Sequence, residues 1–181
     1  MRFSLIDHIE HLIPGVEISA VKNLSMAEEY LADHFPGFPV MPGVLMLEAM
    51  TQAGAWLVRV SEDFAHSMVV LKEARNVKYG QFVEPGQRLC VSAEIVSQTD
   101  RETHLKARGM VDGRTTVSAR LVLERYNLSE KHPERKCTDE LVKQQMRQLF
   151  QLIHRPNGRA AVQETGGSGG APQPANNAPS E

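Results

Sequence analysis

The sequence predicts an α+β fold in which an antiparallel sheet wraps around one long, buried helix. Residues 42–58 form an apolar segment rich in Leu, Met and Ala, which favours a helix. The later segments 88–98, 103–111 and 114–126 are rich in β-branched residues and are separated by turn signals. Because the helix is apolar on nearly every side, most of its faces must be covered, and the simplest cover is a sheet built from these strands.

The remaining strand predictions follow from local pattern. Residues 16–24 and 66–74 also read as strands, and Asp112-Gly113 is a strong hairpin signal between two of the later ones. In the last strand, apolar residues at 117, 119, 121 and 123 alternate with mostly polar ones, as expected for a half-buried antiparallel strand.

Three regions divide the chain. Residues 1–126 form the predicted domain, and residues 127–156 form a charged linker followed by an amphipathic helix at about 138–154, with Thr138 as its N-cap. Its apolar stripe predicts docking on the domain or on a neighbouring subunit; a membrane-surface or carrier-docking helix is the alternative, although its polar face is poor in charge. Residues 157–181 contain one large aliphatic residue and no aromatic residue, which predicts a disordered tail.

Composition limits the classes of function. The formal net charge of −2 and the pI of about 6.4 do not favour nucleic-acid binding. The two cysteines, Cys90 and Cys137, have neither metal-ligand spacing nor a disulfide pattern, which fits a reducing, cytoplasmic location. The longest apolar run is short and polar residues interrupt it, and the N-terminus lacks a signal-peptide core, so no membrane span is expected.

The stretch DHFPGFPVMPGVLMLEAM, at 33–50, carries the candidate chemistry. Pro36, Pro39 and Pro42 recur every third residue, which predicts an extended, stiff segment. A polyproline ligand for an SH3-type domain is one interpretation, but the segment runs directly into a buried helix, so a structural loop entering the core is the better alternative.

Glu48 is the only ionisable group between residues 42 and 58. A carboxyl group in apolar surroundings suits a general acid near neutral pH, whereas a glutamate facing water through a gap in the surface is the structural alternative. His34 is a candidate base, although a lone histidine is usually structural. Between them, the helix N-terminus at Gly43 offers free N–H groups that can bind an oxyanion.

A geometric obstacle separates the two side chains. Glu48 lies roughly 7–9 Å along the helix from its start, and a proline-stiffened loop does not easily fold His34 back onto it. Two subunits related by a two-fold axis would bring His34 of one chain to Glu48 of the other. We therefore expect a homodimer with shared sites.

Residues 34–52 closely resemble the active-site segment of the β-hydroxyacyl-acyl carrier protein dehydratases of type II fatty-acid synthesis. The pattern His-Phe-Pro-Gly-x-Pro-Val-Met-Pro-Gly-Val-Leu, followed by Glu-Ala-Met-x-Gln, is met at every position, and the resemblance extends over residues 1–126. It implies a hot-dog fold, a dimer often assembled into trimers of dimers, and reversible removal of water from a 3-hydroxyacyl thioester.

The resemblance also implies a role for each matched residue. His34 would take the C2 proton, and Glu48 of the partner would protonate the departing C3 hydroxyl. The Gly43 N–H would bind the thioester oxygen, the Val40 carbonyl would orient His34, and Gln52 would support the acid. No metal or organic cofactor is implied, and glutamate rather than aspartate favours a dehydratase that does not also isomerise the double bond.

The resemblance further implies an acidic acyl carrier protein as partner. Candidate docking residues are Lys72, Arg75, Lys78 and Arg88. The family usually has paired arginines and a proline where this chain has Gly80, Gln81 and Phe82, near the acyl tunnel. A hot-dog acyl thioesterase and a non-catalytic acyl-carrier-binding subunit therefore remain as alternative functions.

Overall fold

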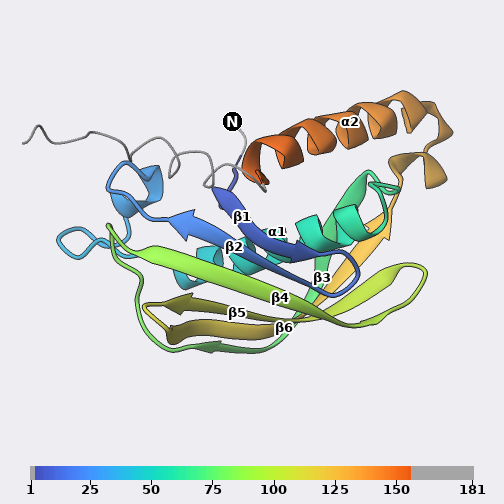
Figure 1. The fold of residues 1–181 in the computed structure, drawn as a ribbon. Coiled ribbons are helices and arrows are strands. Elements are labelled where there is room, and N and C mark those ends of the chain that lie inside the picture. Colours follow the sequence, from blue (N-terminus) through green and yellow to red (C-terminus); the bar gives the residue numbers. More distant parts are fainter. Residues whose placement is uncertain (1–2, 156–181) are drawn as a thin grey trace, which may run out of the picture.

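A six-stranded antiparallel sheet curves around the helix α1 in the computed structural model, which describes residues 3–155 (Figure 1). The strand order is β1-β2-β4-β5-β6-β3. The strands are β1 His8–Ile13, β2 Glu17–Asn23, β3 Met68–Tyr79, β4 Arg88–Gln98, β5 Glu102–Val111 and β6 Arg114–Tyr126. The predicted layer arrangement, one helix wrapped by one sheet, is confirmed.

Helix α1, Gly43–Ser61, starts one residue later than predicted and ends three residues later. Pro42 is its N-cap, where the missing N–H costs nothing. Gly54, which on propensity alone weakens the helix, lies where a Cβ would come within 2.6 Å of a methyl group of Leu105 on β5. The glycine thus lets the helix approach the sheet closely.

The β5–β6 hairpin turns at Asp112-Gly113 as predicted. Both residues have positive φ, 49° and 76°, as a type I′ turn requires. In β6, the alternating residues Val117, Leu121 and Leu123 are all nearly fully buried. This strand therefore packs one face on α1.

Two strands differ from expectation. The sequence analysis did not predict β1, a short strand at one edge of the sheet that contains two histidines and a glutamate. Strand β3, at the other edge, continues to Tyr79, five residues beyond the predicted end at residue 74. Two register irregularities against β6 let this long strand follow the curved sheet.

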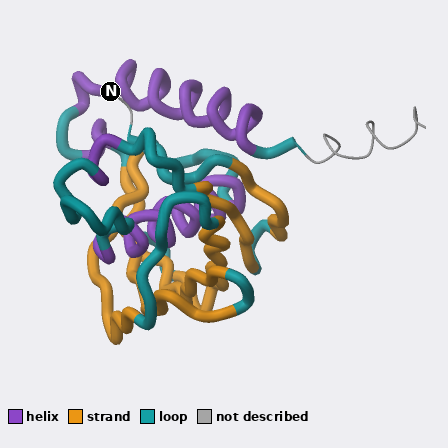
Figure 2. Tube along the Cα trace, turned by 90° about the vertical axis from the view of Figure 1, so that its left-hand side faces the viewer, coloured by secondary structure: helices purple, strands orange, loops and turns teal. Residues whose placement is uncertain are grey.

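Helix α2, Lys136–Ile153, lies across the molecule on the side of α1 away from the sheet (Figure 2). It docks on the domain through its apolar stripe: the ring of Phe150 lies 6.0 Å from those of Trp56 and Phe64, and Ile153 is buried. The predicted N-cap at Thr138 is wrong, because the helix begins two residues earlier and Arg135 occupies the cap position.

Asp139, in the first turn of α2, is buried and joins three segments. It accepts hydrogen bonds from the Ser67 hydroxyl at 2.5 Å and from the N–H groups of Leu128 and Ser129, both at 2.9 Å. The carboxylate therefore fastens the start of α2 to the segment after β6 and to the residue before β3.

The predicted disordered tail, 157–181, lies outside the described residues. Among the described helices, none combines the length and the hydropathy that crossing a membrane requires.

Candidate active site

The loop that carries His34 contains a tight turn. Phe35 and Phe38 exchange backbone hydrogen bonds of 3.1 and 2.9 Å, and Pro36-Gly37 occupies the corner, with Gly37 at φ +83°. Proline followed by a glycine of positive φ is typical of a type II turn. The prediction that the whole segment is extended is therefore wrong at these four residues, because the glycine permits a reversal that proline alone would not.

The backbone on either side of the turn is fixed. The N–H of Val40 donates to the His34 carbonyl at 3.1 Å, and the N–H of Met41 donates to the Val83 carbonyl at 2.8 Å. Val40 and Met41 are buried, which anchors the loop to the core where α1 begins. The Val40 carbonyl was expected to orient the His34 ring. Among residues 3–155, the His34 ring has no hydrogen bond. Val40 instead contacts the His34 backbone through its own N–H.

His34 and Gly43 border the same cavity, of about 480 Å³. The half-buried imidazole of His34 stacks on the ring of Phe35, with the ring centroids 4.2 Å apart. The peptide bond between these two residues is cis. Gly43 is the first residue of α1, so its N–H has no acceptor within the helix. The candidate base and the candidate oxyanion donor therefore border one cavity, and their catalytic roles stay predictions.

Gly43 also makes room for an aromatic wall. A Cβ at this position would come within 3.0 Å of the Tyr79 ring, which lies over the helix start and lines the cavity. Phe82 lines it as well and meets Phe38 of the His34 loop edge to face, with ring centroids 5.7 Å apart. The sequence analysis noted the departure from the family pattern at residues 80–82 but did not assign Tyr79 to the site.

Glu48 is partly buried and is held by Gln52, one turn further along α1. The amide Nε2 of Gln52 donates to Glu48 Oε1 at 2.9 Å. The N-terminal segment holds the amide in place: Leu5 N–H donates to Gln52 Oε1 at 2.8 Å, and Nε2 also donates to the Phe3 carbonyl at 3.2 Å. The hydrogen bond between Gln52 and Glu48 is the contact that the predicted supporting role requires, and the role itself stays a prediction. The contribution of residues 3–5 was missed because backbone groups leave no sequence signature.

Within one chain, the two halves of the site face different ways. Glu48 is not among the residues that line the cavity shared by His34 and Gly43. Glu48 lies five positions after Gly43, which turns it about 140° around the helix axis and displaces it by about 7.5 Å. One chain alone therefore presents the candidate base and oxyanion donor on one face of α1 and the candidate acid on another.

Comparison with known proteins identifies the family of the chain. A family model for the FabA-like domain matches residues 1–120. The chain belongs to the FabA-like family. The match includes every predicted site residue, and it confirms the family that the segment 34–52 had suggested.

Curated relatives of the chain include two dehydratases. The 3-hydroxyacyl-[acyl-carrier-protein] dehydratase FabZ of Pediococcus pentosaceus is 36% identical over 115 residues, which cover 64% of this chain and 77% of the relative. The FabZ of Ruminiclostridium cellulolyticum is 36% identical over 119 residues, covering 66% and 84%.

Solved structures confirm the hot-dog fold at low sequence identity. The dehydratase heterocomplex ApeI:P from Xenorhabdus doucetiae has a TM-score of 0.60 at 17% identity, covering 74% of this chain and 90% of that one. A mutant thioesterase, PA1618 from Pseudomonas aeruginosa, has a TM-score of 0.53 at 16% identity, covering 66% and 81%. These likenesses establish the fold, which both classes share.

Proposed function

We propose that this FabA-like protein catalyses the reversible dehydration of a 3-hydroxyacyl thioester, carried by acyl carrier protein, to the trans-2-enoyl thioester. The observation that carries the proposal is the shared cavity of His34 and Gly43 combined with the Gln52-supported Glu48. The FabZ relatives, at 36% identity, support the same reaction.

The reaction needs a base, an acid and a place for negative charge. The thioester oxygen accepts a hydrogen bond from the Gly43 N–H, which stabilises the enolate-like charge that develops when the C2–H bond breaks. The His34 imidazole takes that proton. The electron pair forms the C2=C3 bond as the C3–O bond breaks, and Glu48 gives its proton to the leaving hydroxyl, which departs as water.

The working unit is a homodimer in which His34 and Gly43 of one chain meet Glu48 of a second copy. The support is geometric, because the two groups open onto different faces of α1 in one chain. A larger assembly, a trimer of dimers, is compatible with the same shared sites. A cytoplasmic location fits the proposed substrate and the two free cysteines, Cys90 and Cys137.

Product analysis tests the reaction. With 3-hydroxyacyl thioesters of several chain lengths, wild-type protein should produce enoyl absorbance, and neither His34→Ala nor Glu48→Gln should do so. Release of free thiol instead would identify a thioesterase. Wild-type protein that binds the carrier but is inert on every substrate would identify a binding subunit.

A further inference from the structure

A second cavity, of about 330 Å³, lies between α1, the N-terminal segment and α2. Its walls are mostly apolar and include the side chains of Phe3, Trp56, Val69, Met146 and Leu149. Met146 and Leu149 belong to α2, which lies beyond residues 1–120, the part of the chain that the family model matches. The cavity therefore depends on a helix that this chain adds to the family domain.

Arg59, in the last turn of α1, brings a positive charge to this apolar cavity. Among the described residues that line the cavity, it is the one charged group. Its Nη1 donates to the carbonyl oxygens of His66 and Ser67, at 3.3 and 3.1 Å, which fixes the guanidinium in place. Its Nε and Nη2 have no hydrogen-bond or ion-pair partner within residues 3–155.

The carboxylates that follow Arg59 in the sequence are paired with other arginines. Glu62 forms an ion pair with Arg125 at 3.0 Å, and Asp63 forms one with Arg147 at 3.7 Å. Burial lowers the pKa of Arg59 to about 10, and no carboxylate of the described chain offsets this effect. Because a partly buried charge without a counter-charge is unfavourable, an anion bound beside Arg59 would stabilise the protein.

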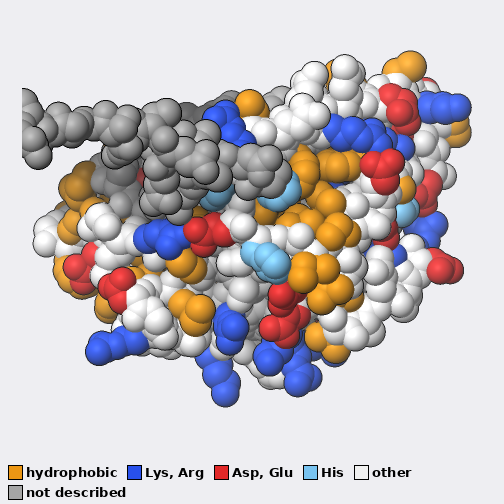
Figure 3. Space-filling view, viewed as in Figure 1, with side chains coloured by type: hydrophobic (Ala, Val, Ile, Leu, Met, Phe, Trp, Pro, Cys, Tyr) orange, Lys and Arg blue, Asp and Glu red, His pale blue; other side chains and the backbone are white. Residues whose placement is uncertain are grey.

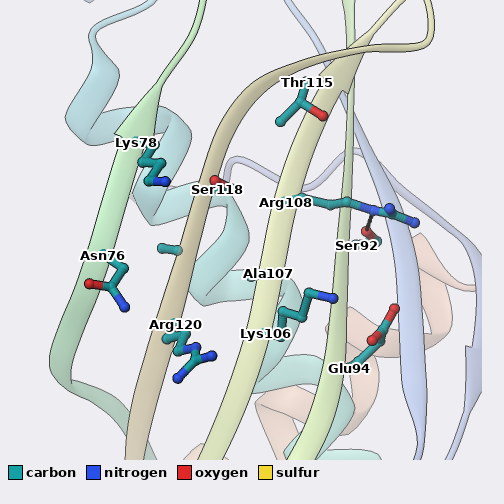
Figure 4. A pocket seen from close by; sticks show the side chains of 11 residues that line it. Asn76, Lys78, Ser92, Glu94, Lys106, Ala107, Arg108, Thr115, Ser118 and Arg120 are labelled. Atoms are coloured by element: carbon teal, nitrogen blue, oxygen red, sulfur yellow. Dashed lines mark hydrogen bonds between the residues drawn. The ribbon is translucent and has the colours of Figure 1, made fainter.

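Cations elsewhere in the described chain are solvated or paired. On the outer face of the sheet, exposed side chains carry the charges of Lys78, Lys106, Arg108 and Arg120 (Figure 4). Figure 3 shows further Lys and Arg side chains that stand out along the lower rim of the molecule. Three of the four predicted docking residues form ion pairs with carboxylates of the same chain: Lys72, Arg75 and Arg88. Arg59 differs from these groups because it is partly buried and has no carboxylate.

The chemistry of the cavity selects the class of ligand. Nε and Nη2 lie on the same edge of a guanidinium, where their N–H groups can bind both oxygens of a carboxylate. The apolar walls require that the rest of the ligand be apolar. A volume of about 330 Å³ is near the lower end of the range of roughly 300–1,000 Å³ for small-molecule sites, so the apolar part is short.

We propose that this cavity binds a short amphiphilic carboxylate, with its head group on Arg59 and its aliphatic chain packed on Trp56, Met146 and Leu149. Gln52 also lines the cavity, and its amide donates to Glu48. The ligand therefore lies beside a residue that holds the proposed acid. The binding itself does not depend on the proposed reaction.

Calorimetric titration of the full chain with octanoate tests the proposal. Octanamide has the same chain without the charge, and acetate has the charge without the chain. Octanoate should bind at least about tenfold more tightly than either, because hydrogen bonds to charged groups contribute more than neutral ones and the chain adds apolar burial.

Variants of the cavity locate the binding. Arg59→Met should weaken octanoate binding at least about tenfold, and Arg59→Lys, which keeps the charge without the paired N–H groups, should weaken it less. Ala55→Leu, which narrows the cavity and leaves Arg59 intact, should also weaken it. The matched control is Arg147→Met: Arg147 also donates to a backbone carbonyl, that of Asp63 at 2.7 Å, but does not line the cavity. This control should bind octanoate as the wild type does.

Three results would overturn the proposal: equal affinity of the wild type for octanoate and octanamide, unchanged octanoate affinity in Arg59→Met, or an equal loss of affinity in Arg147→Met. Melting temperatures show whether each variant folds. If Arg59→Met does not fold, Ala55→Leu and the comparison of octanoate with octanamide on the wild type decide. Because binding is measured directly, a wild-type protein that is inert on every thioester would reject the proposed function and leave this test intact.

Discussion

Gln52 connects the N-terminal segment to the proposed acid. Its amide oxygen accepts from Leu5 N–H, and its amide nitrogen donates to both Phe3 and Glu48. Because both the oxygen and the nitrogen of the Gln52 amide form hydrogen bonds, the orientation of the amide is fixed. The amide in turn fixes the position of one carboxyl oxygen of Glu48. Gln52 therefore acts as a positioning residue.

Replacing Gln52 tests this role. Gln52→Ala removes the hydrogen bond that holds Glu48, worth about 0.5–1.5 kcal/mol, so we expect kcat to fall about 2- to 10-fold. KM should stay near the wild-type value, because Gln52 orients Glu48 and does not line the cavity of His34 and Gly43. Gln52→Glu should not restore activity. A lower melting temperature with an unchanged kcat would contradict a positioning role.

At this scale, the sequence predicted the candidate site residues but not all of the contacts that hold them. The pattern 34–52 supplied His34, Gly43, Glu48 and Gln52 because each has a side chain or a helix position suited to its role. The Phe3 and Leu5 backbone groups and the Tyr79 ring come from distant parts of the chain, and their positions depend on how the sheet closes around α1.

At the scale of elements, Asp139 secures the docking of α2. Burial acts to raise the pKa of this carboxyl, but the hydrogen bonds from Ser67, Ser129 and Leu128 outweigh burial and hold its pKa well below its usual range. A folded-state pKa below the unfolded value means that the carboxylate stabilises the fold above the unfolded pKa and loses that contribution as the pH falls.

Asp139→Asn should therefore destabilise the protein at pH 7 and have a smaller effect in acid. We expect a loss of about 2–3 kcal/mol at neutral pH, because one charged acceptor of three hydrogen bonds is replaced. The difference from wild type should shrink as the pH falls below about 4, the unfolded value for aspartate. Urea unfolding across this pH range measures it, and a difference that does not depend on pH would contradict the account.

A second prediction at the scale of elements concerns Gly54, at the point where α1 approaches β5. In an ordinary helix Gly→Ala is stabilising, but here the added Cβ would meet Leu105, which is 1% exposed and has no room to move. Gly54→Ala should lower the free energy of unfolding by about 1–3 kcal/mol. Thermal unfolding measures this, and a gain in stability would show that the helix does not need the glycine.

Several element boundaries could be predicted because their signals are local. The Asp112-Gly113 turn and the alternation in β6 needed no tertiary information. Strand β1 was missed because it lies at the sheet edge, where burial is incomplete and the pattern weak. The start of α2 was misplaced because Asp139 binds distant N–H groups, so the local capping signal at Thr138 was misleading.

For the whole molecule, the central feature is that the candidate site residues of one chain lie in two separate groups. His34 and Gly43 open into one cavity, and Glu48 with Gln52 lies on another face of α1. The family match covers both groups, and in the proposed function a second copy of the chain brings them together.

The most direct test of this account is complementation between two inactive chains. His34→Ala and Glu48→Gln chains, each with its own affinity tag, are co-expressed, and the mixed dimer is isolated through both tags. Because one of its two sites combines an intact His34 with an intact Glu48, the mixed dimer should recover about half the wild-type dehydratase activity, while each homodimer stays inactive. A mixed dimer as inactive as the two homodimers would show that the sites are not shared between chains.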